Sequence, residues 1–126
     1  MRLGLALAMG LTLAACGQPV RWQKVDGPYL IVAADDPLNR HLSYDLGDGN
    51  AIGRVNATVT GVGHDARYIT VRREPRGQGG PAEHYYVIRA MDGPYGPPEA
   101  VRGPFDKAAY EREVKRLHLP DLAPVY

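Results

Sequence analysis

Cysteine is almost absent from this chain: Cys16 is the only one in 126 residues. A single cysteine cannot form a disulfide within the chain, and it cannot build a zinc site from several thiolates. Serine is equally scarce, because Ser43 is the only one, and it does not lie in a nucleophile-elbow sequence. The folded part of the chain must therefore be stabilised by its hydrophobic core.

An excess of charge of one sign is also lacking. The chain has 15 lysine and arginine residues against 14 aspartate and glutamate residues, and Arg2 lies in the apolar N-terminal segment. Surfaces that bind DNA or RNA need clustered positive charge to neutralise phosphates. Because the basic residues here are scattered among acidic ones, we expect no nucleic-acid partner.

A long hydrophobic run is the third missing feature. The apolar stretch at residues 3–12 follows the positive residue Arg2 and precedes several small residues. Crossing a bilayer takes about 20 apolar residues, whereas a positive residue, a short apolar stretch and small residues are the parts of a secretory signal. We therefore expect residues 1–15 to direct export and to be cleaved.

The small residues end in the sequence Leu13-Ala14-Ala15-Cys16. This run resembles the lipobox of bacterial lipoproteins. The resemblance implies cleavage before Cys16, which would leave 111 of the 126 residues, and attachment of a diacylglycerol to the Cys16 sulfur. Two or more fatty chains hold a protein stably on a membrane, so lipidation would account for the unpaired thiol. The alternative is an ordinary secreted protein with a free thiol.

Two further resemblances bear on location and family. Gly17 follows the anchor residue, where the sorting pattern of two-membrane bacteria has an aspartate in lipoproteins retained in the inner membrane. By this resemblance Gly17 is compatible with delivery to the outer membrane, facing the periplasm, and the inner membrane is the alternative. Residues 62–75, together with Tyr85-Tyr86, are similar to short bacterial lipoproteins of uncharacterised families. That similarity implies a shared domain and carries no known activity.

The mature chain has room for one domain. Residues 16–24 show no repeating pattern and are expected to form a tether, in which Trp22 is the one large apolar residue. Residues 25–126 are expected to form a single small domain. Its sequence Asp-Gly-Pro-Tyr occurs twice, ending at Tyr29 and at Tyr95, and is interpreted as a rigid corner.

Five segments of this domain have strand character. Residues 29–33 form a compact apolar run, and residues 42–46 and 55–60 alternate apolar with polar side chains. Residues 68–73 and 85–88 supply two further strands. The connections are short and rich in turn-forming residues, which favours antiparallel neighbours, since parallel strands need long crossovers.

The periodicity becomes helical near the C-terminus. Asp106 is placed to cap a helix, and Phe105 and Tyr110 flank the cap as a hydrophobic staple. Apolar residues then recur at spacings of four and three, and Pro120 ends the run. The sequence therefore predicts an α+β fold, a single antiparallel meander of about five strands covered by one C-terminal helix.

Four residues are candidate surface contacts. His64 and Asp65 place an imidazole beside a carboxylate, but adjacent residues on a strand point to opposite faces. The preferred interpretation is a turn-forming Asp65 and a partly exposed His64, because a hydrolase would require a concave pocket around His64. Tyr85 and Tyr86 are expected to place one ring in the core and one at the surface, where it would contact protein or glycan.

Metal binding has little support in the sequence. No two of the histidines have the ligand spacing of known zinc sites: His41, His64, His84 and His118. A glycine-rich turn with hard oxygen ligands departs from the EF-hand loop in spacing and lacks its closing glutamate: Asp45, Asp48 and Asn50. We predict no metal and no cofactor.

No group of residues identifies a reaction. The sequence favours a lipid-anchored cell-envelope protein that acts as a protein–protein interaction module and is not an enzyme. The partners would be the membrane, through lipidated Cys16, and an envelope protein of unknown identity. The alternative is a periplasmic inhibitor or immunity protein against an enzyme that attacks the envelope, and a small hydrolase comes third.

Overall fold

The structure is a computed structural model that describes residues 21–75 and 81–125. The predicted signal peptide and Cys16 lie outside the described residues. The elements follow in this order: β1 (Arg21–Asp26), β2 (Tyr29–Ala33), β3 (Arg40–Asp45), β4 (Ala51–Val55), β5 (Val59–His64), β6 (Tyr68–Arg73), β7 (Glu83–Ile88), η1 (Pro98–Ala100), β8 (Val101–Phe105), α1 (Lys107–Leu117) and β9 (Ala123–Pro124).

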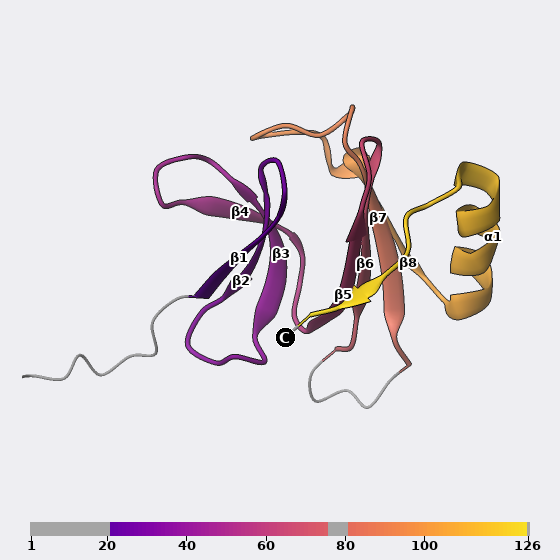
Figure 1. Cartoon of the computed structure of the whole chain (residues 1–126), viewed down its shortest axis with the longest axis horizontal. Coiled ribbons are helices and arrows are strands. Elements are labelled where there is room, and N and C mark those ends of the chain that lie inside the picture. The colour runs from indigo at the N-terminus through magenta and orange to yellow at the C-terminus, as the bar shows by residue number, and fades with distance from the viewer. Residues whose placement is uncertain (1–20, 76–80, 126) are drawn as a thin grey trace, which may run out of the picture.

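The strands form two antiparallel sheets. Sheet A has the order β1-β2-β3-β4, and sheet B has the order β8-β7-β6-β5-β9. The two sheets face each other, and α1 lies on the far side of sheet B (Figure 1). The α+β class is therefore confirmed, but the prediction of a single meander of about five strands is wrong.

The two-sheet arrangement arises within the segment predicted as one strand at residues 55–60. β4 ends at Val55 and β5 begins at Val59, and the chain passes from sheet A to sheet B through residues 56–58. Val55 and Val59 are both buried in the same core. The prediction of one strand at 55–60 is therefore wrong in its middle: residues 56–58 lie in no strand, and Thr58 is buried where the alternation predicted exposure. The two apolar ends of the segment belong to different sheets, which a period of two cannot reveal.

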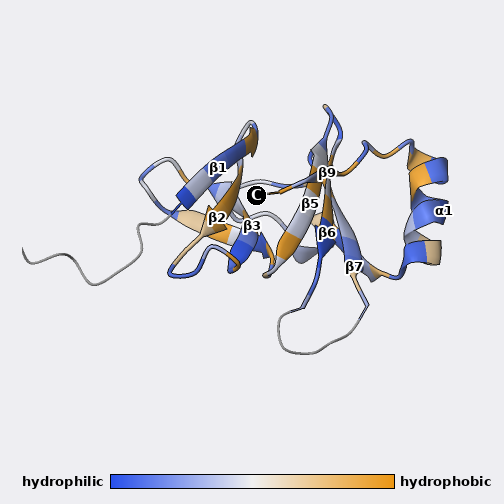
Figure 2. Cartoon of the chain, turned by 60° about the horizontal axis from the view of Figure 1, so that its bottom comes forward, coloured by the Kyte–Doolittle hydropathy of each residue, from blue (hydrophilic) through white to orange (hydrophobic). Residues whose placement is uncertain are grey.

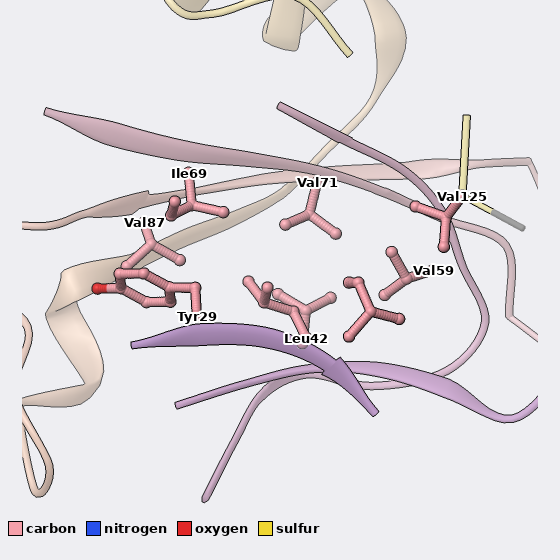
Figure 3. Close-up of a cluster of buried hydrophobic side chains, with 9 residues drawn as sticks. Tyr29, Leu42, Val59, Ile69, Val71, Val87 and Val125 are labelled. Atoms are coloured by element: carbon pink, nitrogen blue, oxygen red, sulfur yellow. The ribbon is translucent and has the colours of Figure 1, made fainter. Parts of the chain in front are cut away.

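The main core lies between the two sheets (Figure 3). Ile31 pairs with Leu42 across β2 and β3, so both side chains lie on the same face of sheet A. The buried residues of this core are Tyr29, Ile31, Leu42, Val55, Val59, Ile69, Val71, Val87 and Val125. Sheet B, rather than the helix, thus covers the apolar face of sheet A.

A second apolar layer joins sheet B to the helix. Tyr86 of β7, Tyr110 of α1 and Leu119 form its buried centre. The carboxylate of Asp106 accepts a hydrogen bond from the Ala109 backbone N–H at 2.7 Å, and His118 ends the helix in the left-handed conformation. The predicted helix and its cap are confirmed.

Most of β4 and three further strands were absent from the prediction. β1 begins at Arg21, so residues 21–24 of the predicted tether belong to sheet A, where they pair with β2. Figure 2 shows β1 as mostly hydrophilic beside a mostly hydrophobic β2, so β1 carries no apolar periodicity. β8 contains Gly103 and Pro104, which are depleted in strands, and β9 has two residues.

The antiparallel strands place their connections at two opposite ends of the domain. One end holds the β1–β2, β3–β4 and β5–β6 turns and the β7–β8 loop, and we call it the distal end (top of Figure 1). The tethered end holds the start of β1, the β2–β3 loop and the β4–β5 connection. Within the described residues, no helix is long and apolar enough to cross a membrane.

Candidate functional site

A group of charged and aromatic side chains joins the two sheets at the distal end. The four strands of sheet A supply some of its members, and the β7–β8 connection supplies the others. We call this group the distal cluster, and it consists of Asp26, Tyr29, Tyr44, Arg54, Arg89 and Asp92.

The distal cluster contains a buried ion pair. Arg54 Nε donates to the two carboxylate oxygens of Asp92 at 2.9 and 3.1 Å, and the two side chains are 8% and 1% exposed. Arg54 Nη2 also donates to the Gly93 carbonyl at 2.6 Å, and its guanidinium lies 4.9 Å from the centre of the Tyr44 ring. A buried pair with this many partners fixes the β7–β8 loop against β4.

Tyr29 occupies the centre of the distal cluster. Its hydroxyl donates to Asp92 at 2.9 Å, and its ring meets the Tyr44 ring edge-on at 5.5 Å. The guanidinium of Arg89 lies 5.5 Å from the Tyr29 ring centre. Burial and the hydrogen bond to Asp92 raise the pKa of the Tyr29 hydroxyl well above its usual value, so it remains a donor at physiological pH.

Arg89 connects the distal cluster to the surface. Its Nη1 donates to the Asp26 carboxylate and to the Asp65 carbonyl, both at 2.6 Å. The hydrogen bond from Arg89 lowers the pKa of Asp26. This half-exposed arrangement holds the β1–β2 turn of sheet A against the β5–β6 turn of sheet B.

His64 and Asp65 do not form a catalytic pair. The Asp65 carboxylate accepts hydrogen bonds from the backbone N–H groups of Arg67 and Tyr68 at 2.8 and 2.7 Å, so it shapes the turn as expected. His64 is exposed at the end of β5, and its Nδ1 lies 3.9 Å from Asp26, too far for a hydrogen bond. The carboxylate near His64 is thus that of Asp26 and not that of its sequence neighbour Asp65, and both His64 and Asp26 are about half exposed.

Tyr85 and Tyr86 alternate across β7 as expected, but neither supplies a free aromatic surface. Tyr86 is 4% exposed beneath the helix, and its hydroxyl donates to Glu113 at 3.1 Å. Tyr85 packs against the core between the sheets and donates to Glu83 at 2.8 Å. Sheet B has an apolar layer on both faces, so both rings are used in packing.

Within residues 21–75 and 81–125, the most exposed aromatic side chain is instead Tyr95, at 87%, in the β7–β8 loop, which also carries Met91, at 40%. A side chain at Gly96 would meet the Gly93 backbone nitrogen and the Asp92 carboxylate at 2.6 and 2.7 Å, so the loop turns tightly there. The buried Arg54–Asp92 pair then holds the base of the loop.

The repeated Asp-Gly-Pro-Tyr sequence is the one feature of the sequence that pointed to residues of the distal end. Its first copy supplies Asp26 and Tyr29 to the distal cluster, and its second copy supplies Asp92 and the exposed Tyr95. The Tyr29 hydroxyl of the first copy donates a hydrogen bond to the Asp92 carboxylate of the second copy. The sequence indicated two rigid corners, but it could not show that they meet.

Three of the surface grooves in the described part of the chain lie away from His64. One of about 210 Å³ lies at the tethered end beside Trp22, Pro37 and Arg40, and one of about 310 Å³ lies between β4 and the β7–β8 loop. A third, of about 350 Å³, lies beside His84. None of the three is lined by His64, and within the described residues no three acidic, histidine or cysteine side chains gather as metal ligands.

His84 is the one buried histidine with an unpartnered atom among the described side chains. Its Nδ1 has no hydrogen-bond partner, and its ring stacks on Tyr110 with 4.6 Å between centres. Burial lowers the pKa of His84, so the neutral ring is the form that packs here.

Comparison with known proteins gives no relative from which to transfer a role. No family model, curated protein or solved structure matches this chain significantly.

Proposed function

We propose that this chain is a lipid-anchored cell-envelope protein that binds an envelope protein through its distal end. The observation that carries the proposal is the separation of two features along the domain. The lipobox cysteine lies shortly before β1, which starts at the tethered end, whereas the exposed β7–β8 loop lies at the opposite end.

The length of the tether supports an orientation with the distal end outward. Cys16 precedes Arg21 by five residues, and a fully extended chain spans at most about 3.6 Å per residue, or about 18 Å over this stretch. The start of β1 would therefore stay close to the headgroups of the membrane. We place that membrane as the outer one, with the protein facing the periplasm, on the basis of Gly17.

The form of the β7–β8 loop supports protein binding. Tyrosine is enriched among residues that dominate protein interfaces, because it offers a large contact area with few rotatable bonds. Tyr95 projects from a loop whose base is fixed by the buried Arg54–Asp92 pair and whose sequence contains Pro94, Pro97 and Pro98. Such a loop loses little conformational entropy when a partner binds.

Photocrosslinking of the full-length, lipidated protein in intact cells tests the proposal. A photoreactive amino acid at position 91 should give a discrete crosslinked species, because Met91 is exposed in the same loop as Tyr95, four residues before it. Tyr95→Ala in the same protein should reduce that species about tenfold or more, which corresponds to at least 1.4 kcal/mol of lost binding free energy.

A photoreactive residue at position 111, on the exposed surface of α1, is the matched control. The proposal fails if positions 91 and 111 give the same products, or if the product from position 91 is unchanged by Tyr95→Ala. A partner that attacks the envelope would make the protein an inhibitor or immunity protein acting through the same surface.

A further inference from the structure

Two exposed apolar side chains lie at the tethered end, opposite the distal cluster. Trp22, near the start of β1, is 40% exposed, and Leu38, in the β2–β3 loop, is 52% exposed. The groove beside Trp22 is also lined by Pro37, the neighbour of Leu38, so the two segments flank one groove. Neither side chain is part of the core between the sheets.

The loop that carries Leu38 is held rigidly from within the domain. Arg40 donates to the carbonyls of Val59 and Pro37 at 2.9 and 3.2 Å, and the Thr58 hydroxyl donates to the Leu38 carbonyl at 2.6 Å. These bonds use the backbone of the loop and leave the Leu38 side chain outward. Contact through this side chain therefore requires little additional ordering.

Among the residues that the structure describes, the charges around Trp22 and Leu38 balance. Arg21 and Arg40 lie at this end of sheet A, and Asp35 and Asp36 lie in the β2–β3 loop. On sheet B, Arg73 pairs with Glu83 at 2.7 Å. Balanced charge gives the described part of this surface no preference for an anionic partner, and tryptophan is a side chain that favours the interface between a lipid layer and water.

We propose that Trp22 and Leu38 rest on the headgroup region of a zwitterionic phospholipid surface and so fix the orientation of the domain on its membrane. This inference rests on the lipid anchor of the proposed function. Trp22 lies six residues from Cys16, which gives a reach of at most about 22 Å. Over so short a tether, the anchor raises the effective concentration of the patch at the membrane, so even a weak contact is populated.

Trp22 is the only tryptophan in the chain, so its fluorescence reports this contact without labelling. The full-length lipidated protein would be reconstituted in phosphatidylcholine vesicles, with and without bromine atoms on the upper part of the acyl chains. We expect the brominated lipid to quench Trp22 emission and the emission maximum to lie at a shorter wavelength than in detergent-free, unlipidated protein. Quenching should persist at high salt, because the contact is apolar.

Leu38→Asn should reduce the quenching, because it removes the apolar side chain and leaves the backbone carbonyl that Thr58 binds. Tyr95→Asn, at the distal end, is the matched control and should leave quenching unchanged. Protein that remains on the vesicles while brominated lipid leaves Trp22 emission unaltered would overturn the inference and leave the anchor intact.

The Cys16→Ser variant separates the two proposals. If the wild-type protein leaves the vesicles as readily as Cys16→Ser, the lipid anchor itself is wrong. Quenching that disappears at high salt would also overturn the inference, since it would indicate attraction between charges.

Discussion

The two ends of the domain are closed by different kinds of hydrogen bond. At the distal end, arginine and tyrosine side chains donate to carboxylates, chiefly those of Asp92 and Asp26. At the tethered end, side chains donate mainly to backbone carbonyls, as Arg40 does to Val59 and Thr58 does to Leu38. The stability of the distal end therefore depends on buried and half-buried charges, and the stability of the tethered end depends on hydrogen bonds to backbone carbonyls.

This difference suits the two proposed roles. A network built on carboxylates fixes the loop that carries Tyr95, and it fails as a unit when one charged partner is removed. Bonds to backbone carbonyls tolerate substitution of the residue whose carbonyl accepts, so exposed residues such as Leu38 are free to serve a surface. We expect the distal end to be sensitive to mutation and the tethered end to be tolerant.

The largest effect is expected from Asp92→Ala. The variant leaves the guanidinium of Arg54 buried without its carboxylate, which should lower the free energy of unfolding by about 3–5 kcal/mol. Urea denaturation checks this value, with Asp48→Ala in the exposed β3–β4 turn as the control. A loss no greater than that of the control would show that the distal end does not depend on this charge.

Arg40→Met should have a smaller effect at the tethered end. It removes the donor from the carbonyls of Val59 and Pro37 but leaves no buried charge, so we expect a loss of about 1–3 kcal/mol in the same denaturation experiment. A loss larger than that of Asp92→Ala would reverse the comparison between the two ends.

Asp106→Ala provides a reference that affects neither end. The substitution removes the cap of α1 and should cost about 1 kcal/mol. The crosslink from position 91 should remain, because the helix covers the opposite face of sheet B from the sandwich core. A lost crosslink in a folded variant would mean that the helix contributes to the partner surface.

The smallest expected effect is a difference in the pH range over which each end loses its contribution to the free energy of unfolding. Burial, and then the charge of Arg73, lower the pKa of His41 near the tethered end below its usual 6.5. Below pH 6.5, His41 is protonated more readily in the unfolded chain than in the folded one. The contribution of His41 to the free energy of unfolding is therefore complete above pH 6.5 and decreases as the pH falls toward the lowered pKa. The pKa of Asp26 at the distal end is lowered from 3.8, so its contribution decreases only at more acidic pH.

The variant His41→Gln isolates that contribution, since His84 acts in the same direction in both proteins. Unfolding measured from pH 7 to pH 5 should show a shallower decrease in the variant. Identical slopes for the two proteins would show that His41 does not titrate differently on folding.

Local features of the fold were predictable from the sequence, and pairings between distant segments were not. The cap at Asp106 and the turn at Asp65 were found because their hydrogen bonds join residues two or three apart. The division into two sheets was missed because Val55 and Val59 keep one alternating pattern across a change of sheet. β1 was missed because its exposed, polar side chains show no period, although its backbone pairs with β2.

The candidate site was likewise predictable only where its contacts are local in the sequence. His64 and Asp65 attracted attention as neighbours, whereas the structure joins residues far apart in the chain, such as Tyr29 with Asp92 and Arg54 with Asp92. Tyr95 could be recognised as a corner residue, but its exposure depends on how the β7–β8 loop folds back on Arg54. Such contacts leave no spacing signal in a single sequence.

Mass spectrometry of the N-terminal peptide is the most direct test of the account, because both proposals need Cys16 at the membrane. The protein would be produced at full length in bacteria that process lipoproteins and extracted from the membrane fraction. Trypsin cleavage after Arg21 should release a peptide that begins at Cys16 and carries a diacylglycerol on sulfur. A tryptic peptide that begins at Leu3, left by cleavage after Arg2 of an unprocessed chain, or one that begins at Cys16 with an unmodified thiol, would show that Cys16 is not the lipidated N-terminus.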